Sequence, residues 1–365
     1  MYKQALLINK NGDEFVGWTT EIFKPTTGEL IFNTAMTGFV EILSDPSYIN
    51  QMITFTSSHV GNYGMSKDDF ESNEPKIEAA IANSFTYQPS SWRSEKSITD
   101  WLREYEIPFS GGFDVRAITT HIRDCGSNMY AFGVDVDSND LIEMLNKAKD
   151  IVGDNSALSA GKGKTKVQNA SGKIGVLDLG AKESILNVLS TKKYETVLIT
   201  PETNPETILS LGLSGLLISN GPGDPRSLTK VIENIKELIG KLPIFGICLG
   251  HQILSLACGL KVNKLEFGHH GSNHPVKIKG LKKALITSQN HGFSVQNFDD
   301  PIEHQDYGVI DTYAINLNDG SNEGISIWDS NAYSVQFHPE SGPGTTDALQ
   351  IFSPFLEMIE EKHAS

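Results

Sequence analysis

The sequence predicts an α/β protein in which a separate α+β domain precedes a C-terminal, mostly parallel sheet flanked by helices. In the C-terminal half, short apolar runs alternate with helix-compatible stretches; the runs lie at residues 173–179, 196–200, 213–219 and 244–247. Strands that alternate with helices in this way imply a parallel sheet with helices on both faces. The last run leads directly into Gly246-Ile247-Cys248-Leu249-Gly250, which has the glycine spacing of a nucleophile elbow.

The helices expected among these strands cover residues 184–189, 206–211, 228–239 and 253–258. Beyond residue 260 the pattern changes to short strands, which we expect at residues 276–278, 285–287, 312–316, 324–328 and 332–337, before a final helix at residues 345–362. Two polar segments, 267–275 and 289–293, fall between these strands. The first contains three histidines, but their spacing matches no common zinc pattern and no cysteine or carboxylate partner is near. We therefore expect no metal site in this chain.

The N-terminal half is expected to contain both strands and helices, and no motif in it alone indicates a particular reaction. A hairpin is expected at residues 5–18, strands at 28–33 and 52–56, and helices at 94–105 and 118–123. Asp45-Pro46-Ser47 favours a turn, so Ser47 should lie in a loop. This half is consistent with a docking role.

A linker is expected where the sequence turns to serine, alanine, glycine and lysine. We place the N-terminal domain at residues 1–153, the linker at 154–172 and the C-terminal domain at 173–365. A basic functional loop is the alternative for this segment.

Composition limits the classes of function. The chain has 365 residues, enough for two domains, and a formal net charge of −15, which disfavours binding to nucleic acid or to an anionic membrane. Its three widely spaced cysteines indicate a reducing, cytoplasmic compartment rather than a disulfide framework. No apolar run is long enough for a membrane span, and no signal peptide is visible, so we expect no membrane association.

Cys248 is the candidate nucleophile. Gly246 and Gly250 permit a tight strand-to-helix turn, and Cys248 would then lie at a helix N-terminus, where backbone N–H groups and the helix dipole favour a thiolate. The N–H of Leu249 is placed to donate to an oxyanion. A buried structural cysteine in such a turn is the alternative, and a nucleophile also needs a base.

His338 is the candidate base. The strand expected at residues 332–337 stops at His338-Pro339-Glu340, because proline cannot continue a central ladder. His338 can deprotonate Cys248, and Glu340 can hold the imidazole through its other nitrogen. Taken alone, His338 would be read as a structural histidine; together with the elbow, a Cys-His-Glu triad is the better interpretation.

A second glycine-rich loop, Ser219-Asn220-Gly221-Pro222-Gly223-Asp224-Pro225, also follows an expected strand. In parallel sheets, ligands bind beyond the carboxyl ends of the strands. This loop could offer backbone N–H groups to an oxyanion or to a substrate carbonyl, or it could be only a tight turn.

These residues together resemble the class I (triad) glutamine amidotransferases, and more closely the small, glutamine-hydrolysing subunits of carbamoyl-phosphate synthetase. The resemblance covers nearly the whole chain. Residues 246–252 and 338–340 match the wider class, whereas residues 219–225, 267–276 and 288–293 are more specific. In the N-terminal half, the matching motifs are Phe32-Asn33-Thr34, Met36-Thr37-Gly38, Asp45-Pro46-Ser47-Tyr48, His59-Val60-Gly61-Asn62 and Phe113-Asp114-Val115-Arg116. The chain departs from the family pattern at Glu183, Ser272, Ser341 and Thr346, none of which is a triad residue.

The resemblance implies a role for each matching residue. Cys248 is the nucleophile, His338 the base and acid, and Glu340 the orienting carboxylate. Leu249 and Gly221 supply the oxyanion N–H groups. The glutamine pocket is implied at Ser47, Gly223, Gln252, Asn290, Gly292 and Phe293. Because Ser47 comes from the N-terminal domain, the family pattern implies an active site at the domain interface.

The implied reaction is hydrolysis of glutamine through a γ-glutamyl thioester on Cys248. Ammonia would pass to a large, ATP-dependent subunit that makes carbamoyl phosphate from bicarbonate. The chain has no Walker-type sequence, so we expect no cofactor here and place ATP and its metal ion on the partner. Two alternatives remain open: a glutaminase that serves another synthase or acts alone, and a catalytically idle regulatory scaffold.

Overall fold

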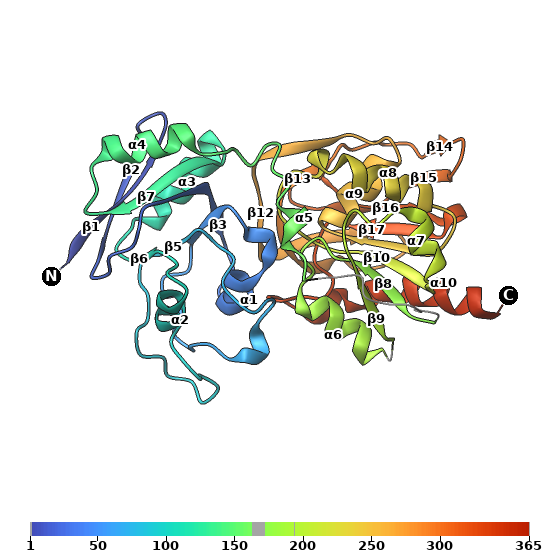
Figure 1. Ribbon diagram of the computed structural model, residues 1–365, viewed down its shortest axis with the longest axis horizontal. Helices are drawn as coiled ribbons and strands as arrows, with labels where there is room; N and C mark the ends of the chain where they lie inside the picture. The colour runs from blue at the N-terminus through green and yellow to red at the C-terminus, as the bar shows by residue number, and fades with distance from the viewer. Residues whose placement is uncertain (1, 163–171, 193, 365) are drawn as a thin grey trace. The chain divides into compact units, whose positions relative to one another are not determined.

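The computed structural model describes residues 2–162, 172–192 and 194–364, the side chains of residues 362–364 excepted (Figure 1). The chain divides into two compact units. The first comprises Met1–Asp154 with Glu266–Gly271, and the second comprises Asn155–Leu265 with Ser272–Ser365. Within the expected linker, residues 157–160 form a short helix, α5 (Ala157–Ala160), and residues 163–171 lie outside the described part of the chain.

The described residues of the first unit contain a seven-stranded mixed sheet with the order β2-β1-β7-β3-β4-β5-β6. The strands are β1 (Lys3–Asn9), β2 (Glu14–Thr19), β3 (Thr26–Asn33), β4 (Gln51–Phe55), β5 (Ala79–Ile81), β6 (Phe109–Ser110) and β7 (Asn128–Val134). Strands β3 to β6 pair in parallel, whereas β7 is antiparallel to both β1 and β3. The hairpin expected at residues 5–18 is present as β1 and β2.

Most helices of the first unit begin where a side chain caps them, whereas Gly38, which precedes the first helix, offers no side-chain cap. They are α1 (Phe39–Ser44), α2 (Ile98–Glu104), α3 (Val115–Cys125) and α4 (Ser138–Lys147), with single 3₁₀ turns η1 (Pro46–Tyr48) and η2 (Lys67–Asp69). The helix expected from residue 94 begins at Ile98, because the Ser97 side chain accepts a hydrogen bond from the backbone N–H of Asp100. Asp114 caps α3 in the same way, so that helix begins before the expected residue 118. Strand β7 and helix α4 were not anticipated.

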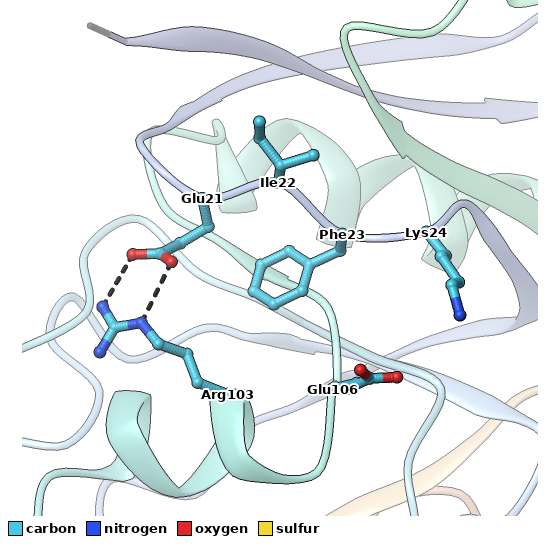
Figure 2. Close-up of a pocket in the computed structure, with 6 residues that line it drawn as sticks. All are labelled: Glu21, Ile22, Phe23, Lys24, Arg103 and Glu106. Carbon is cyan, nitrogen blue, oxygen red and sulfur yellow. Dashed lines mark hydrogen bonds and ion pairs between the residues drawn. The ribbon is translucent and has the colours of Figure 1, made fainter.

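A pocket of about 410 Å³ in the first unit is lined by Glu21, Ile22, Phe23, Lys24, Arg103 and Glu106 (Figure 2). Arg103 and Glu21 pair through two hydrogen bonds, of 3.1 and 2.7 Å. The charges of Arg103 and Glu21 therefore neutralise each other. The pocket contains none of the residues expected to act on glutamine.

The second unit confirms the predicted α/β class with a nucleophile elbow. Its sheet has the order β13-β12-β15-β16-β17-β11-β10-β8-β9, with β14 beside β15. The parallel part is β9-β8-β10-β11-β17, and β16, β15 and β12 extend it as antiparallel strands. The strands are β8 (Ile174–Leu177), β9 (Thr196–Ile199), β10 (Gly215–Ile218), β11 (Ile244–Ile247), β12 (Val262–Ile278), β13 (Leu285–Val295), β14 (Ile302–His304), β15 (Gly308–Asn316), β16 (Asn322–Ile327) and β17 (Ala332–Val335).

Helices cover both faces of the parallel strands (Figure 1). They are α6 (Glu183–Thr191), α7 (Pro205–Ser210), α8 (Thr229–Leu238), α9 (Leu249–Ala257) and α10 (Ser353–Ala364), with 3₁₀ segments η3 (Pro225–Ser227), η4 (Trp328–Ser330) and η5 (Thr346–Phe352). Leu216 of β10 packs in one core with residues of α8 and α9, and Leu217 packs in the other with residues of α6 and α10. Successive residues of a strand point to opposite faces, so each strand serves both cores. In the described part of the chain, no helix is both long and apolar enough to cross a membrane.

Three expectations for this half were wrong in extent. The polar segments 267–275 and 289–293, placed between strands, lie within β12 and β13. Most of β13 is buried, including its polar residues, so the alternation that marks a half-exposed strand is absent. The final helix begins at Ser353 after the 3₁₀ segment η5 rather than at residue 345. Helix α9 begins at Leu249, directly after the elbow, rather than at residue 253.

Candidate active site

Cys248 connects β11 to α9 in a strained backbone conformation. Its φ is 54° and its ψ is −104°, a combination that non-glycine residues rarely adopt and that surrounding structure must stabilise. The backbone N–H of Cys248 donates to Val335 O at 2.9 Å, and its carbonyl accepts from the N–H of His251 at 3.0 Å and of Gln252 at 3.2 Å. The turn is therefore fixed by the neighbouring strand on one side and by the first turn of the helix on the other.

The flanking glycines are required by close backbone contacts. A Cβ at Gly246 would lie 2.6 Å from Gly250 O, and a Cβ at Gly250 would lie 2.1 Å from Ile218 O. Both distances are shorter than any ordinary contact of a side-chain carbon. The spacing that predicts an elbow in the sequence thus has a steric cause, because the helix starts almost in contact with β10 and β11.

The candidate triad residues lie within the second unit, all of them buried. His338 Nδ1 lies 2.6 Å from Glu340 Oε1. The backbone N–H of His338, three residues beyond the end of β17, donates to Ser288 O of β13 at 2.9 Å. The Cys248 thiol, 2% exposed, donates to Asn290 O at 3.4 Å. Cys248 also interacts with the His338 imidazole, so the three side chains expected to form the triad are brought together.

Charge interactions set the protonation of His338 and Glu340. Burial lowers the pKa of His338, but the Glu340 carboxylate and the Cys248 thiol outweigh this effect and hold that pKa above the ordinary histidine value. Burial would raise the pKa of Glu340, whereas the Lys182 ammonium and His338 lower it below the usual glutamate range. Glu340 is therefore the ionised partner that stabilises an imidazolium on His338.

Lys182 is the part of this cluster that sequence reasoning missed. Its side chain is 1% exposed, and its Nζ lies 3.0 Å from Glu340 Oε1. The same ammonium donates to the carbonyls of Ser341 at 2.8 Å and Gly342 at 2.7 Å. The signal available was a lysine just beyond the carboxyl end of β8, where parallel sheets bind ligands. Because lysine is seldom buried, the residue type favoured a surface position for Lys182.

The glycine-rich loop after β10 lies against the turn that carries Lys182. A Cβ at Gly221 would lie 2.3 Å from Leu179 O, so only glycine fits there, and Gly223 has a φ of 86°. Asn220 Oδ1 accepts a hydrogen bond from the backbone N–H of Lys182 at 3.1 Å. The conformation of the loop is therefore fixed by its contacts with the neighbouring turn at residues 179–182.

Two of the expected pocket residues, Gln252 and Phe293, contact each other within the second unit, and Asn290 and Gly292 lie beside Phe293 on β13. Gln252 Nε2 donates to Phe293 O at 3.0 Å, and the carbonyl of Asn290 accepts from the Cys248 thiol. Gly292 lies between them on β13. A Cβ there would meet no other heavy atom of the described residues within 4 Å, so the backbone of Gly292 borders open space.

Ser47 belongs to the first unit. It lies in η1, not in an irregular loop, and its backbone N–H donates to Asp45 Oδ1 at 2.8 Å. Asp45 thus caps the 3₁₀ turn and accounts for the Asp-Pro-Ser signal. The assignment of Ser47 to the glutamine pocket stays a prediction.

The lowered pKa of Glu340 gives a test by pH. A carboxyl that is ionised more readily in the folded state stabilises the fold above the ordinary glutamate pKa of about 4.3, and this contribution is lost as the pH falls through the folded-state pKa. Between pH 5 and pH 3, we expect the free energy of unfolding to fall less in Glu340→Gln than in the wild type. Urea denaturation at each pH measures this difference. Parallel wild-type and variant curves would show that Glu340 contributes no such linkage.

Comparison with family models matches both halves of the chain. Residues 175–358 match "Glutamine amidotransferase class-I". Residues 7–132 match "Carbamoyl-phosphate synthase small chain, CPSase domain". The first match includes the elbow and the His338–Glu340 pair, and the second includes Ser47.

Whole-chain relatives are similar over nearly their full length. A carbamoyl phosphate synthase small chain from Bacillus caldolyticus is 40% identical over 356 residues, which cover 97% of this chain and 96% of that protein. A carbamoyl phosphate synthase pyrimidine-specific small chain from Bacillus subtilis is 39% identical and covers 97% of this chain and 95% of its own. A protein of the same description from Halalkalibacterium halodurans is 39% identical, with 98% of both chains covered.

Proposed function

The chain belongs to the carbamoyl-phosphate synthase small chain family, and we propose that it hydrolyses glutamine and delivers the ammonia to a large, ATP-dependent subunit that makes carbamoyl phosphate from bicarbonate. The observation that supports this most is the strained Cys248 elbow beside the buried His338–Glu340 pair. A nucleophile, a base and an orienting carboxylate in this arrangement are the parts needed for acyl transfer.

In the first half of the proposed reaction, His338 takes the thiol proton and the Cys248 thiolate attacks the γ-carbonyl carbon of glutamine. The backbone N–H groups of Leu249 and Gly221 stabilise the oxyanion that forms. As the carbon–nitrogen bond breaks, His338 returns its proton to the leaving nitrogen, which departs as ammonia. A γ-glutamyl thioester remains on Cys248.

In the second half, His338 accepts a proton from water as the water oxygen attacks the thioester carbonyl. The carbon–sulfur bond breaks, glutamate leaves, and the thiolate regains the proton. Glu340 stays ionised throughout and stabilises the imidazolium of His338 in both halves. No cofactor in this chain is required by these steps.

Ser47→Ala tests the contribution of the N-terminal domain to the glutamine pocket. We expect the KM for glutamine to rise more than kcat falls, because one neutral hydrogen bond in binding is worth about 0.5–1.5 kcal/mol. Initial rates of glutamate release over a range of glutamine concentrations measure both constants. Unchanged kinetics would remove Ser47 from the pocket.

Coupling to a partner distinguishes a synthase subunit from a stand-alone glutaminase. Free hydrolysis wastes glutamine, so we expect slow glutamate release by the chain alone and faster release with its large subunit, ATP and bicarbonate. Catalytic groups misplaced by about 1 Å can lower the rate on the order of a hundredfold. A partner that corrects their positions could therefore raise the rate of glutamate release by a similar factor. Equal rates in the two conditions would favour a glutaminase that acts alone or that supplies ammonia to a different synthase.

The setting of the proposed reaction is the cytoplasm. Cys125, Cys248 and Cys258 are free thiols, which supports a reducing compartment. Carbamoyl phosphate serves arginine and pyrimidine synthesis, and the pyrimidine-specific names of two relatives favour the second. The intact triad geometry argues against a catalytically idle scaffold.

A further inference from the structure

A closed ring of hydrogen bonds adjoins the Cys248 elbow in the second unit. Its members are polar groups of Glu323, Gln289, His291, Phe293, Gln252 and Gln336. Gln252 is on α9, four residues after Cys248, and Gln336 is two residues before His338. The ring therefore links the elements that carry the nucleophile and the base to the β13 segment opposite the thiol.

The orientation of the Gln289 amide is fixed from two sides. Thr287 Oγ1 donates to the carbonyl of His274 at 2.9 Å, so the hydroxyl oxygen can only accept from Gln289 Nε2 at 3.1 Å. The same Nε2 donates to Glu323 Oε2 at 2.9 Å. A flipped amide would place its oxygen against a carboxylate oxygen. Gln289 Oε1 consequently points to His291.

His291 faces a hydrogen-bond acceptor at both ring nitrogens. Nε2 lies 2.8 Å from Gln289 Oε1, and Nδ1 lies 2.8 Å from Phe293 O. A carbonyl oxygen and an amide oxygen have no proton to offer, and a neutral imidazole has only one N–H. Both contacts are hydrogen bonds only if His291 carries a proton on each nitrogen, which makes it an imidazolium.

Glu323 supplies the opposite charge. It is 0% exposed, and one of its carboxylate oxygens lies within 4.8 Å of a ring nitrogen of His291. Asn316 Nδ2 donates to Glu323 Oε1 at 2.8 Å, and Gln289 donates to the other oxygen. A buried charge is costly unless it is paired and hydrogen-bonded, and this pair, bridged by one amide, meets both conditions.

We propose that Glu323 is a positioning residue for glutamine hydrolysis, because it keeps His291 doubly protonated and thereby fixes residues 289–293 opposite Cys248. The consequence for catalysis rests on the proposed function. Glu323 also accepts from the N–H of Gln336 through its own carbonyl, at 2.8 Å. One residue thus secures the β13 segment that contacts the thiol and the chain that leads to His338.

The protonation of His291 is tested directly by ¹⁵N NMR of the full chain labelled at histidine, with the signal assigned by its loss in His291→Asn. At pH 8, above the ordinary histidine pKa of about 6.5, we expect a proton coupled to each ring nitrogen of His291. Glu323→Gln should leave only one coupled nitrogen. A wild-type spectrum with a neutral His291 overturns the proposal, even in an active enzyme.

A double variant that moves the carboxylate from residue 323 to residue 289 tests whether the imidazolium of His291 can be restored. In Gln289→Glu combined with Glu323→Gln, the carboxylate lies directly beside His291, so the imidazolium signal should return. We expect the KM for glutamine to rise about tenfold in Glu323→Gln, with kcat within about twofold, and to recover by at least about threefold in the double variant. Glu303→Gln, on the exposed strand β14, is the charge-loss control and should match wild type.

The possible results separate this proposal from the proposed function. An imidazolium in wild type with an unchanged KM in Glu323→Gln overturns the positioning role. Wild-type chain that hydrolyses no glutamine, alone or with its partner, overturns the proposed function whatever the state of His291. If Glu323→Gln does not fold by circular dichroism, the wild-type spectrum and the kinetics of the double variant decide.

Discussion

Replacing Cys248 with serine is expected to lower kcat for glutamine hydrolysis by about 10⁴-fold or more. Serine has nearly the same shape, so the strained elbow and its backbone hydrogen bonds should be kept. Its hydroxyl ionises far less readily than a thiol, and a base suited to a thiol cannot activate it well. Glutamate release measures the loss, and circular dichroism checks that the variant is folded.

Cys258→Ser is the matched control. Cys258 lies at the end of α9, is 5% exposed, and burial raises the pKa of its thiol to about 12. Such a thiol supplies almost no thiolate at neutral pH, so activity should stay within about twofold of wild type. Substantial glutaminase activity in Cys248→Ser would remove Cys248 as the nucleophile.

Replacing Lys182 with methionine is expected to lower the free energy of unfolding by about 3 kcal/mol, the usual loss when one partner of a buried ion pair is removed. Methionine fills similar space but cannot pair with Glu340 or donate to the carbonyls of Ser341 and Gly342. Glutamine hydrolysis should fall as well, because Ser341 and Gly342 directly follow Glu340, the proposed triad carboxylate. Urea denaturation followed by fluorescence measures the stability change.

Lys230→Met removes an exposed ion pair with Glu233 on α8, whose groups lie 3.8 Å apart. Exposed pairs contribute about 0–1 kcal/mol, so this control should leave stability almost unchanged. Equal effects of the two lysine variants would show that the Lys182–Glu340 pair does not stabilise the second unit.

The elbow and the pattern of parallel strands were predictable because their signals are local. Gly246 and Gly250 flank Cys248 within one turn, and the steric contacts that require them involve only the adjacent strands and the start of α9. Likewise, β8, β10 and β11 are short apolar runs buried on both faces, which the sequence shows directly. His338 and Glu340 could be paired with Cys248 only by assuming that β17 lies beside β11, which it does.

Lys182 and Glu323 could not be found in this way, because their surroundings come from distant parts of the chain. The groups that accept from Lys182 lie some 160 residues further on, and no sequence spacing reports them. The polar residues of β13 suggested a loop because their partners, including Glu323 and Gln252, are supplied by other strands and by α9. Buried polar groups become acceptable only after the tertiary structure has paired them.

Mapping the covalent intermediate tests the central claim most directly. The full chain is mixed with isotopically labelled glutamine, quenched in acid within the first turnovers, and digested for mass spectrometry. We predict a labelled γ-glutamyl group on the peptide that contains Cys248, and none in Cys248→Ser. A label on the peptide of Cys125 or Cys258, or rapid hydrolysis that persists in Cys248→Ser, would contradict the account.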